Sequence, residues 1–324
     1  MKRESSRLPV LLLAIAFVVL TSLGCSTTSG PSENPDPLAA SIDSPATDTT
    51  IVEGGTVSFQ GSAAGGTAPY TYAWDFDGGA TNSTVEDPGD IVFETAGTFT
   101  VTIVVTDDAD DSDSSTVTIP VTAPVAHFPF NGNAEDESGN ENDATVYGAT
   151  LAPDRFGNDD SAYSFNGSGD YIQTPVDSNA LPLSVSVWFK ASDVSGERSI
   201  VDSDVFGQSG HSLIIGWWTG DGNLDIEYHD AGIDVDYSVA VDTWYHAVVN
   251  FSGVIQLYVN GVRIGEDFDY TPGSLNGDLF RLGRHNPFDP QWFSGTIDDV
   301  RFYGRILTEE DVQTLYSEGG WTGP

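Results

Sequence analysis

The 324-residue sequence is poor in cysteine and in basic residues. It contains one cysteine, one methionine and 11 lysine or arginine residues against 49 aspartate or glutamate residues, so its formal net charge is −38. A single cysteine excludes a disulfide-stapled fold and any zinc site built from several cysteines. The negative charge repels phosphate backbones, so we expect no nucleic acid partner and expect cations to be favoured.

No apolar run is long enough to form a permanent membrane span. The longest covers residues 8–20, and a helix of that length spans roughly 20 Å, against a hydrocarbon core of about 30 Å. Basic residues at Lys2, Arg3 and Arg7 precede the run, and small residues follow it. This order of charge, apolar stretch and small residues predicts an export signal over residues 1–25.

The only cysteine, Cys25, ends this segment where cleavage would fall. The sequence TSLGC resembles a bacterial lipobox, although Ser22 stands where that motif prefers leucine. The resemblance implies that Cys25 is lipidated and that this anchor is the only contact with the membrane. Ser26 follows Cys25 in place of the aspartate that retains lipoproteins at the inner membrane, so we expect the cell envelope, at the outer membrane of a Gram-negative bacterium. Secretion with a chance cysteine is the alternative.

Residues 26–37 contain only small, polar or acidic residues and proline, which predicts a flexible linker. Period-two alternation follows in Val57–Phe59, Phe99–Val105 and Val117–Val121. Short alternating strands without a helix signal predict a small β-sandwich over residues 38–123. The segments YTYAWDFDGG (70–79) and AGTFTV (96–101) make this region resemble a PKD domain, with an immunoglobulin-like fold. Domains of this kind commonly act as spacers.

Strand patterns recur every 8 to 15 residues between 163 and 303, which predicts a larger antiparallel sandwich over residues 124–318 and a tail over 319–324. Asn260-Gly261 lies between two apolar runs and predicts a two-residue hairpin, because both residues tolerate positive φ. Thr308 precedes acidic residues and an apolar stripe, which predicts one capped helix near the C-terminus.

The order of motifs in residues 124–318 resembles the concanavalin A-like, laminin G-like jelly roll. The motifs are FPFNGNAEDESGN (128–140), YSFNG (163–167), SVSVWFK (184–190), WYHAV (244–248), LYVNG (257–261) and GTIDDVRFY (295–303). The resemblance implies an all-β chain in which a PKD-like sandwich is followed by a jelly roll. It also implies that Trp188 and Trp244 pack in the interior and that His246 is a packed strand residue.

The resemblance further implies a structural Ca²⁺ site where the first and last strands of the jelly roll meet. Asp136, Asn142 and Asp298 offer the hard oxygens that Ca²⁺ prefers. Asp and Asn in a Gly-rich turn also serve as ordinary turn formers, which is the competing explanation for these residues.

Several large aromatic residues near turns are not explained by the family motifs. Aromatic rings on a rigid loop suit sugar stacking or a protein contact, and the alternative is that they cover the edge of the sandwich. Only one of two adjacent strand residues can face the same core, so at most one of the two neighbouring tryptophans can be buried in it. The predicted ligand-binding residues are Trp217, Trp218, His285, Asn286, Phe288, Gln291 and Trp292.

Catalysis is not expected. Residues 223–227 read NLDIE, one residue short of the ExDxE strand motif of glucanases in the same superfamily, because Asn223 replaces the first carboxylate. Retaining hydrolysis requires two carboxyl groups, so the degenerate motif argues against a glycosidase. The sequence therefore predicts a non-catalytic surface lipoprotein that binds a glycan or another surface polymer through the jelly roll. A structural or protein-interaction component of the envelope is the alternative, followed by a glycoside hydrolase.

Overall fold

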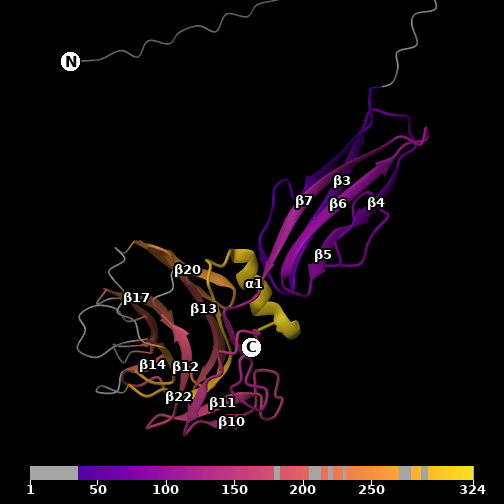
Figure 1. The fold of residues 1–324 in the computed structure, drawn as a ribbon. Coiled ribbons are helices and arrows are strands. Elements are labelled where there is room, and N and C mark those ends of the chain that lie inside the picture. The colour runs from indigo at the N-terminus through magenta and orange to yellow at the C-terminus, as the bar shows by residue number, and fades with distance from the viewer. Residues whose placement is uncertain are drawn as a thin grey trace, which may run out of the picture. The chain divides into compact units, whose positions relative to one another are not determined.

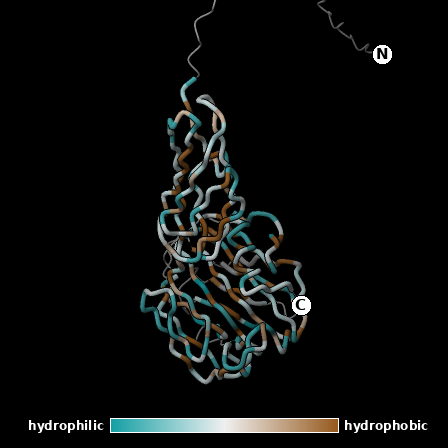
Figure 2. Tube along the Cα trace, turned by 90° about the vertical axis from the view of Figure 1, so that its right-hand side faces the viewer, coloured by the Kyte–Doolittle hydropathy of each residue, from teal (hydrophilic) through white to brown (hydrophobic). Residues whose placement is uncertain are grey.

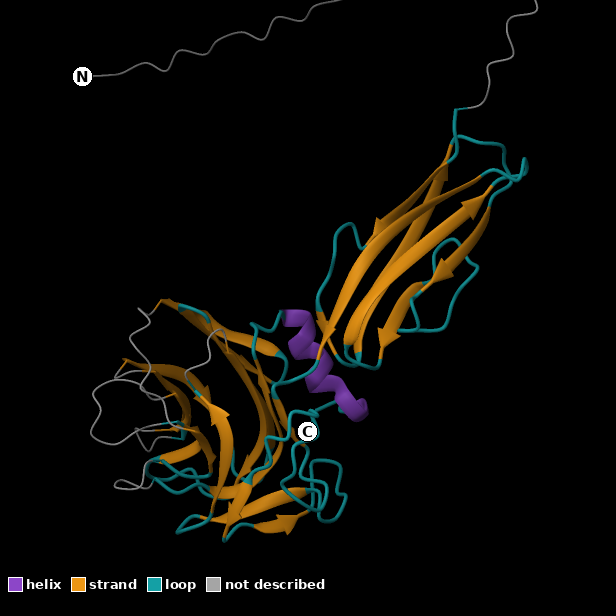
Figure 3. Cartoon of the chain, viewed as in Figure 1, coloured by secondary structure: helices purple, strands orange, loops and turns teal. Residues whose placement is uncertain are grey.

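The computed structural model describes residues 36–178, 183–203, 213–217, 222–228, 231–269, 279–285 and 291–323. Strands dominate these residues, as Figure 3 shows. The chain divides into two units, residues 1–36 and residues 37–324, and the second is compact. Within the described part of the chain, no helix is long and apolar enough to span a bilayer.

The N-terminal sandwich, defined here as residues 38–123, contains two β-sheets (Figure 1). One sheet has the strand order β1-β3-β5 and the other has the order β2-β7-β6-β4, in which only β2 and β7 pair in parallel. The strands are β1 (Ala39–Ser44), β2 (Ile51–Val52), β3 (Gly55–Ala64), β4 (Thr71–Asp75), β5 (Gly89–Phe93), β6 (Gly97–Thr106) and β7 (Ser112–Thr122).

The core of the N-terminal sandwich follows from the period-two alternation of its strands. Successive strand residues point to opposite faces, and the alternate residues Val101, Ile103 and Val105 of β6 and Val117, Ile119 and Val121 of β7 are apolar and buried. Trp74 is buried and packs edge-on against Phe59, and its Nε1 donates to the Val85 carbonyl. Trp74 is thus part of the core of the N-terminal sandwich.

The C-terminal sandwich, defined here as residues 124–318, has two larger sheets. The first sheet has the order β10-β11-β22-β13-β18-β19-β20, with β8 also paired to β22, and the second has the order β17-β16-β15-β14-β21-β12-β9. Strands of the first sheet are β8 (Ala126–Phe128), β10 (Thr150–Ala152), β11 (Ala162–Asn166), β13 (Leu183–Ala191), β18 (Trp244–Phe251), β19 (Val254–Val259), β20 (Val262–Asp269) and β22 (Ser294–Tyr303). Strands of the second are β9 (Thr145–Tyr147), β12 (Tyr171–Asp177), β14 (Arg198–Asp202), β15 (Leu213–Trp217), β16 (Asn223–Tyr228), β17 (Ala231–Ser238) and β21 (Leu279–Leu282).

One apolar core lies between the two sheets of the C-terminal sandwich. In β13, Val185, Val187 and Phe189 join this core, while Trp188 joins a separate cluster with Trp244. Figure 2 shows how hydrophobic and hydrophilic residues alternate with one another along the chain. Both tryptophans are buried, as the sequence predicts, but they pack outside the inter-sheet core.

The predicted hairpin and helix both form. Asn260 and Gly261 have φ values of 50° and 78° and connect β19 to β20. Helix α1 (Glu309–Ser317) begins after Thr308, whose side chain accepts from the Asp311 N–H, while the Asp311 carboxylate accepts from the Thr308 N–H. This reciprocal capping satisfies donors that the first turn of a helix leaves open. A short 3₁₀ turn, η1 (Glu318–Gly320), follows.

A β-bulge in β22 brings three charged residues to one face. Trp188 pairs with Asp298 and Ser186 pairs with Arg301, so two residues of β22, Asp299 and Val300, lie opposite a single residue of β13. Asp299 has a φ of 44°, in the left-handed region. Val300 joins the core between the sheets, while Asp298, Asp299 and Arg301 line a cleft.

The predicted fold class, an all-β chain with an immunoglobulin-like sandwich followed by a jelly roll, is confirmed. The predicted signal segment over residues 1–25, including Cys25, lies outside the described residues. Almost all of the predicted linker over residues 26–37 also lies outside them. The proposed domain boundaries stay predictions.

Candidate functional site

Asp136, a predicted Ca²⁺ ligand, organises a turn in the structure. One carboxylate oxygen accepts from the N–H groups of His127 and Ser138, and the other accepts from the Asn142 N–H and the Ser138 hydroxyl, all at 2.8–2.9 Å. Burial opposes ionisation, but these hydrogen bonds hold the pKa of Asp136 below its usual range. Each oxygen already accepts two hydrogen bonds, so the carboxylate has no free acceptor position for a metal.

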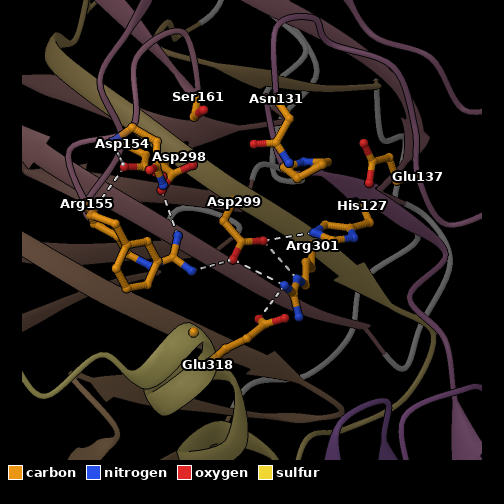
Figure 4. A pocket seen from close by; sticks show the side chains of 14 residues that line it. His127, Asn131, Glu137, Asp154, Arg155, Ser161, Asp298, Asp299, Arg301 and Glu318 are labelled. Atoms are coloured by element: carbon orange, nitrogen blue, oxygen red, sulfur yellow. Dashed lines mark hydrogen bonds and ion pairs between the residues drawn. The ribbon is translucent and has the colours of Figure 1, made fainter.

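Asp298, the second predicted ligand with a carboxylate, lies in a cleft of about 320 Å³ beside the bulge of β22 (Figure 4). Arg155 bridges the bulge, because Nη1 lies 2.7 Å from Asp298 and Nη2 lies 3.0 Å from Asp299. The Arg155 guanidinium also lies 4.6 Å from the Trp188 ring centroid, a cation–π distance. The side chain of Arg155 is only 7% exposed, so its charge is held between two carboxylates and a ring.

Asp299 is the central acceptor of the cleft. Its carboxylate also contacts His127 Nε2 at 3.0 Å and Arg301 Nε at 2.9 Å, and Arg301 pairs in turn with Glu318. Burial alone would raise the pKa of Asp299, but the Arg301 charge and the His127 hydrogen bond hold it well below its usual range. Asp299 is therefore ionised at neutral pH.

Asp298 has the opposite electrostatic character. Burial, followed by repulsion from the Asp299 carboxylate, raises the pKa of Asp298 to about 7 despite the Arg155 contact. Arg155 engages only one of its oxygens. Among the residues that the structure describes, no group of three or more His, Cys, Asp or Glu is arranged to hold a metal ion. Of the predicted calcium ligands, Asp298 keeps a free oxygen for a cation, whereas Asp136 does not fit that role.

The third predicted calcium ligand, Asn142, belongs to the turn of Asp136. Its side-chain amide donates to the Val125 carbonyl at 2.8 Å, and its backbone N–H is held by Asp136. Calcium binding stays a prediction, with Asp298 as the residue that carries it.

The predicted ligand-binding residues divide into three groups. Trp218, Asn286 and Phe288 lie outside the described residues. Trp217 is 0% exposed and packs edge-on against Phe293 in the core, so its predicted contact with a ligand is corrected. The alternation of β15 turns this ring inward, and the sequence alone could not decide which of the two neighbouring tryptophans faces the core. His285, Gln291 and Trp292 lie in the segment between β21 and β22, where Trp292 forms an isolated bridge to Ser199 of β14 in the second sheet.

Trp292 belongs to an aromatic group that we call the Trp292 patch. It comprises Tyr147, Tyr171, Arg284 and Trp292, which contact one another in turn. We add Gln291, which precedes Trp292 in the chain and whose Nε2 donates to Glu197 at 2.7 Å. Tyr147 and Tyr171 are paired residues of β9 and β12 whose rings stack 4.4 Å apart, and Trp292 lies 6.3 Å from Tyr171. The Arg284 guanidinium lies 4.6 Å from the Tyr171 ring and 5.2 Å from the Trp292 ring.

The Trp292 patch combines exposed apolar surface with unused polar atoms. Tyr147 is 45% exposed, and Tyr171, Trp292, Arg284 and Gln291 are half-buried. Within the described part of the chain, Arg284 Nε and Gln291 Oε1 are buried without a hydrogen-bond partner. Buried polar atoms normally have partners, so a bound polar molecule would complete this surface. Tyr147, Tyr171 and Arg284 were not expected here, because only their pairing across the sheet brings them to Trp292.

A buried polar triad lies on the same sheet. The Asp202 carboxylate, 0% exposed, contacts His285 Nδ1 at 2.6 Å and Arg281 Nη2 at 3.2 Å. Asp202 and Arg281 are paired residues of β14 and β21. The triad fixes the chain immediately after β21, and Arg284 of the Trp292 patch lies in that segment. His285 is thus placed beside the patch, although it is bonded to Asp202.

The glucanase-like segment forms β16, as its alternation indicates. Leu224 and Ile226 join the core, and Asp225 is buried. Asn223 stands at the start of the strand where the catalytic motif has a carboxylate. The first carboxylate of that motif is therefore absent at position 223.

Comparison with known proteins agrees with this two-domain, all-β architecture. Residues 37–123 match the family model of the PKD domain, and residues 166–313 match that of the concanavalin A-like lectin/glucanases superfamily. No curated protein sequence matches the chain.

Solved structures resemble the chain over about three fifths of its length. One is domain 4 of AbnA, a GH43 extracellular arabinanase from Geobacillus stearothermophilus, in complex with arabinotriose. It is 25% identical, with a TM-score of 0.50 over 60% of this chain and 98% of that one. The botulinum neurotoxin serotype D binding domain is 19% identical, with a TM-score of 0.48 over 61% of this chain and 52% of that one.

Proposed function

We propose that the protein binds a neutral glycan, without catalysis, through the Trp292 patch of its C-terminal sandwich. The observation that carries this proposal is the patch itself, in which a guanidinium lies against two of three neighbouring aromatic rings and two buried polar atoms have no hydrogen-bond partner among the described residues. Domain 4 of AbnA, a similar chain solved with arabinotriose, supports an oligosaccharide as the ligand class.

The chemistry of the patch suits a sugar. An aromatic face covers the apolar C–H face of a sugar ring, and such surface contributes about 25 cal/mol per Å² removed from water. Arg284 Nε can donate to a ring or hydroxyl oxygen, and Gln291 Oε1 can accept from a hydroxyl. The formal net charge of −38 repels uronic or sulfated polymers, so a neutral glycan is the expected partner.

Two further parts of the proposal rest on the sequence. The protein is non-catalytic because Asn223 replaces the carboxylate that glucanases of the superfamily use at this position. The protein is anchored at the cell surface through lipidated Cys25, and the N-terminal sandwich separates the binding domain from that anchor. Neighbouring polysaccharide at the envelope is the expected source of the ligand.

The test uses the mature chain with linear arabino-oligosaccharides and a panel of neutral polysaccharides, in affinity electrophoresis and calorimetry. Trp292→Ala should weaken binding about tenfold or more, because a stacked ring contributes about 1–3 kcal/mol. Trp321→Ala is the matched control, since Trp321 packs on Trp188 of the first sheet, away from the second. Both variants are also melted, so that a loss of folding is separated from a loss of binding.

Three outcomes count against the proposal. The first is wild-type protein that binds none of the glycans, and the second is Trp292→Ala protein that binds as tightly as wild type. The third is release of reducing sugar from a bound glycan, which would replace non-catalytic binding by hydrolysis.

A further inference from the structure

Strand β2 of the N-terminal sandwich carries one residue that belongs to the interior of the C-terminal sandwich. Its two residues point in opposite directions: Ile51 joins the core of the N-terminal sandwich, and Val52 does not. Val52 is 0% exposed. It packs in a cluster whose other members all come from the C-terminal sandwich, namely Val248, Tyr258, Tyr303, Leu307, Val312 and Leu315.

A buried carboxylate holds the backbone at the same place. The Val52 N–H donates to Asp311 Oδ1 at 3.0 Å. Asp311 Oδ2 accepts from the Thr308 N–H, the Thr308 hydroxyl and Arg305 Nη1 at 2.8–2.9 Å. Asp311 is 2% exposed. Its carboxylate completes the capping box of α1 and also accepts from a strand of the other sandwich.

Arg305 makes a second link between the sandwiches. Its Nε donates to the Thr122 hydroxyl at 2.8 Å, and Thr122 is the last residue of β7. Only three residues separate the end of β7 from the start of β8. Residues 37–324 accordingly form one compact unit.

We propose that the two sandwiches unfold as one cooperative unit, joined by Val52, Asp311 and Arg305, rather than as independent domains. Opening the joint would expose the Val52 side chain and the cluster around it. It would also remove the partner of the buried Asp311 oxygen, and both changes are unfavourable in water. The N-terminal sandwich is therefore a structural part of the binding domain as well as a spacer.

The experiment weakens one sandwich and observes the other in the mature chain. Six of the seven tryptophans lie in residues 124–324, so thermal unfolding followed by tryptophan fluorescence reports mainly on the C-terminal sandwich. Phe59→Ala creates a cavity in the core of the N-terminal sandwich, where Phe59 is 0% exposed. In a coupled unit this change should lower the fluorescence midpoint by at least about 3 °C.

The joint itself is tested by Val52→Asp, with Val104→Asp as the matched control at an exposed position of β6. Val52→Asp should split the single calorimetric transition into two and abolish the response of the fluorescence midpoint to Phe59→Ala. Val104→Asp should do neither. Two resolved transitions in wild-type protein, or a fluorescence midpoint that ignores Phe59→Ala, would overturn the proposal. Neither result bears on glycan binding at the Trp292 patch, which is measured separately.

Discussion

The buried imidazole of His246 should make the protein lose stability in mild acid. His246 lies on β18, is 1% exposed, and stacks on Trp188 with ring centroids 4.8 Å apart. Its Nε2 lies 2.8 Å from the Ser186 hydroxyl, and its Nδ1 has no partner among the described residues. Burial lowers the pKa of His246 from 6.5 to about 3, because the charged form would be far from water.

The direction of the effect follows from proton binding. Between about pH 6.5 and pH 3 the unfolded chain binds a proton at His246 and the folded chain does not, so the free energy of unfolding falls as the pH falls. Acidification from pH 7 to pH 4.5 should therefore remove about 2.5 kcal/mol through this one group, at about 1.36 kcal/mol per pH unit. Against a typical total of about 5–15 kcal/mol, this is a large loss.

Urea unfolding at pH 7, 5.5 and 4.5 measures the effect, with His246→Phe as the comparison. Phenylalanine keeps a ring on Trp188 but does not titrate. It leaves the Ser186 hydroxyl without its partner, which costs about 1–3 kcal/mol at every pH. The carboxylates titrate alike in both proteins, so the difference between the two pH profiles isolates the imidazole. Parallel profiles for wild type and His246→Phe would refute the buried neutral imidazole.

Three other predictions concern the anchor, the cleft and the calcium site. Cys25→Ser should move the protein from the membrane fraction to the soluble fraction or leave it unprocessed, and wild-type protein without bound fatty acid would contradict the anchor. Arg155→Met should lower the free energy of unfolding by about 3–5 kcal/mol, because it removes the ion-pair partner of buried Asp298 and one of the three partners of buried Asp299. Arg263→Met removes an exposed ion pair with Asp267 and should lower the free energy of unfolding by about 1 kcal/mol or less. Equal losses in the two variants would show that the Arg155 contacts do not stabilise the fold. A hundredfold excess of Ca²⁺ over its dissociation constant should stabilise the wild type by roughly 2.7 kcal/mol. Asp298→Ala should abolish that gain and Asp136→Ala should keep it, whereas an unchanged melting temperature in EDTA, with no calcium found by metal analysis, would exclude the site.

The strands, the hairpin and the helix could be predicted because their signals are local. Alternation in β6, positive φ at Asn260-Gly261 and the cap at Thr308 each depend on a few neighbouring residues. The alternation of β15 also predicts that at most one of two neighbouring tryptophans faces the core, but not which one. That choice depends on the pairing of β15 with its neighbours in the sheet.

The contacts of the cleft and of the Trp292 patch could not be predicted, because they join residues far apart in the sequence. Arg155 meets Asp298 and Asp299 across more than 140 positions. Tyr171 meets Arg284 and Trp292 only after β12 pairs with β21. Asp136 is the opposite, local case, since Asp in a Gly-rich turn binds its own backbone and these bonds compete with the predicted ligand role.

The bulge at Asp299 suggests how the charged cleft could arise in evolution. Without that one residue, Ile297, Asp298, Val300, Arg301 and Phe302 would alternate regularly along β22, and the same apolar residues would still face the core. Insertion of a single codon would then supply the acceptor shared by Arg155, Arg301 and His127 without changing which side chains fill the interior. One inserted or deleted residue in such a strand can therefore create or remove a cluster of ion pairs, while the apolar residues that fill the sandwich stay the same.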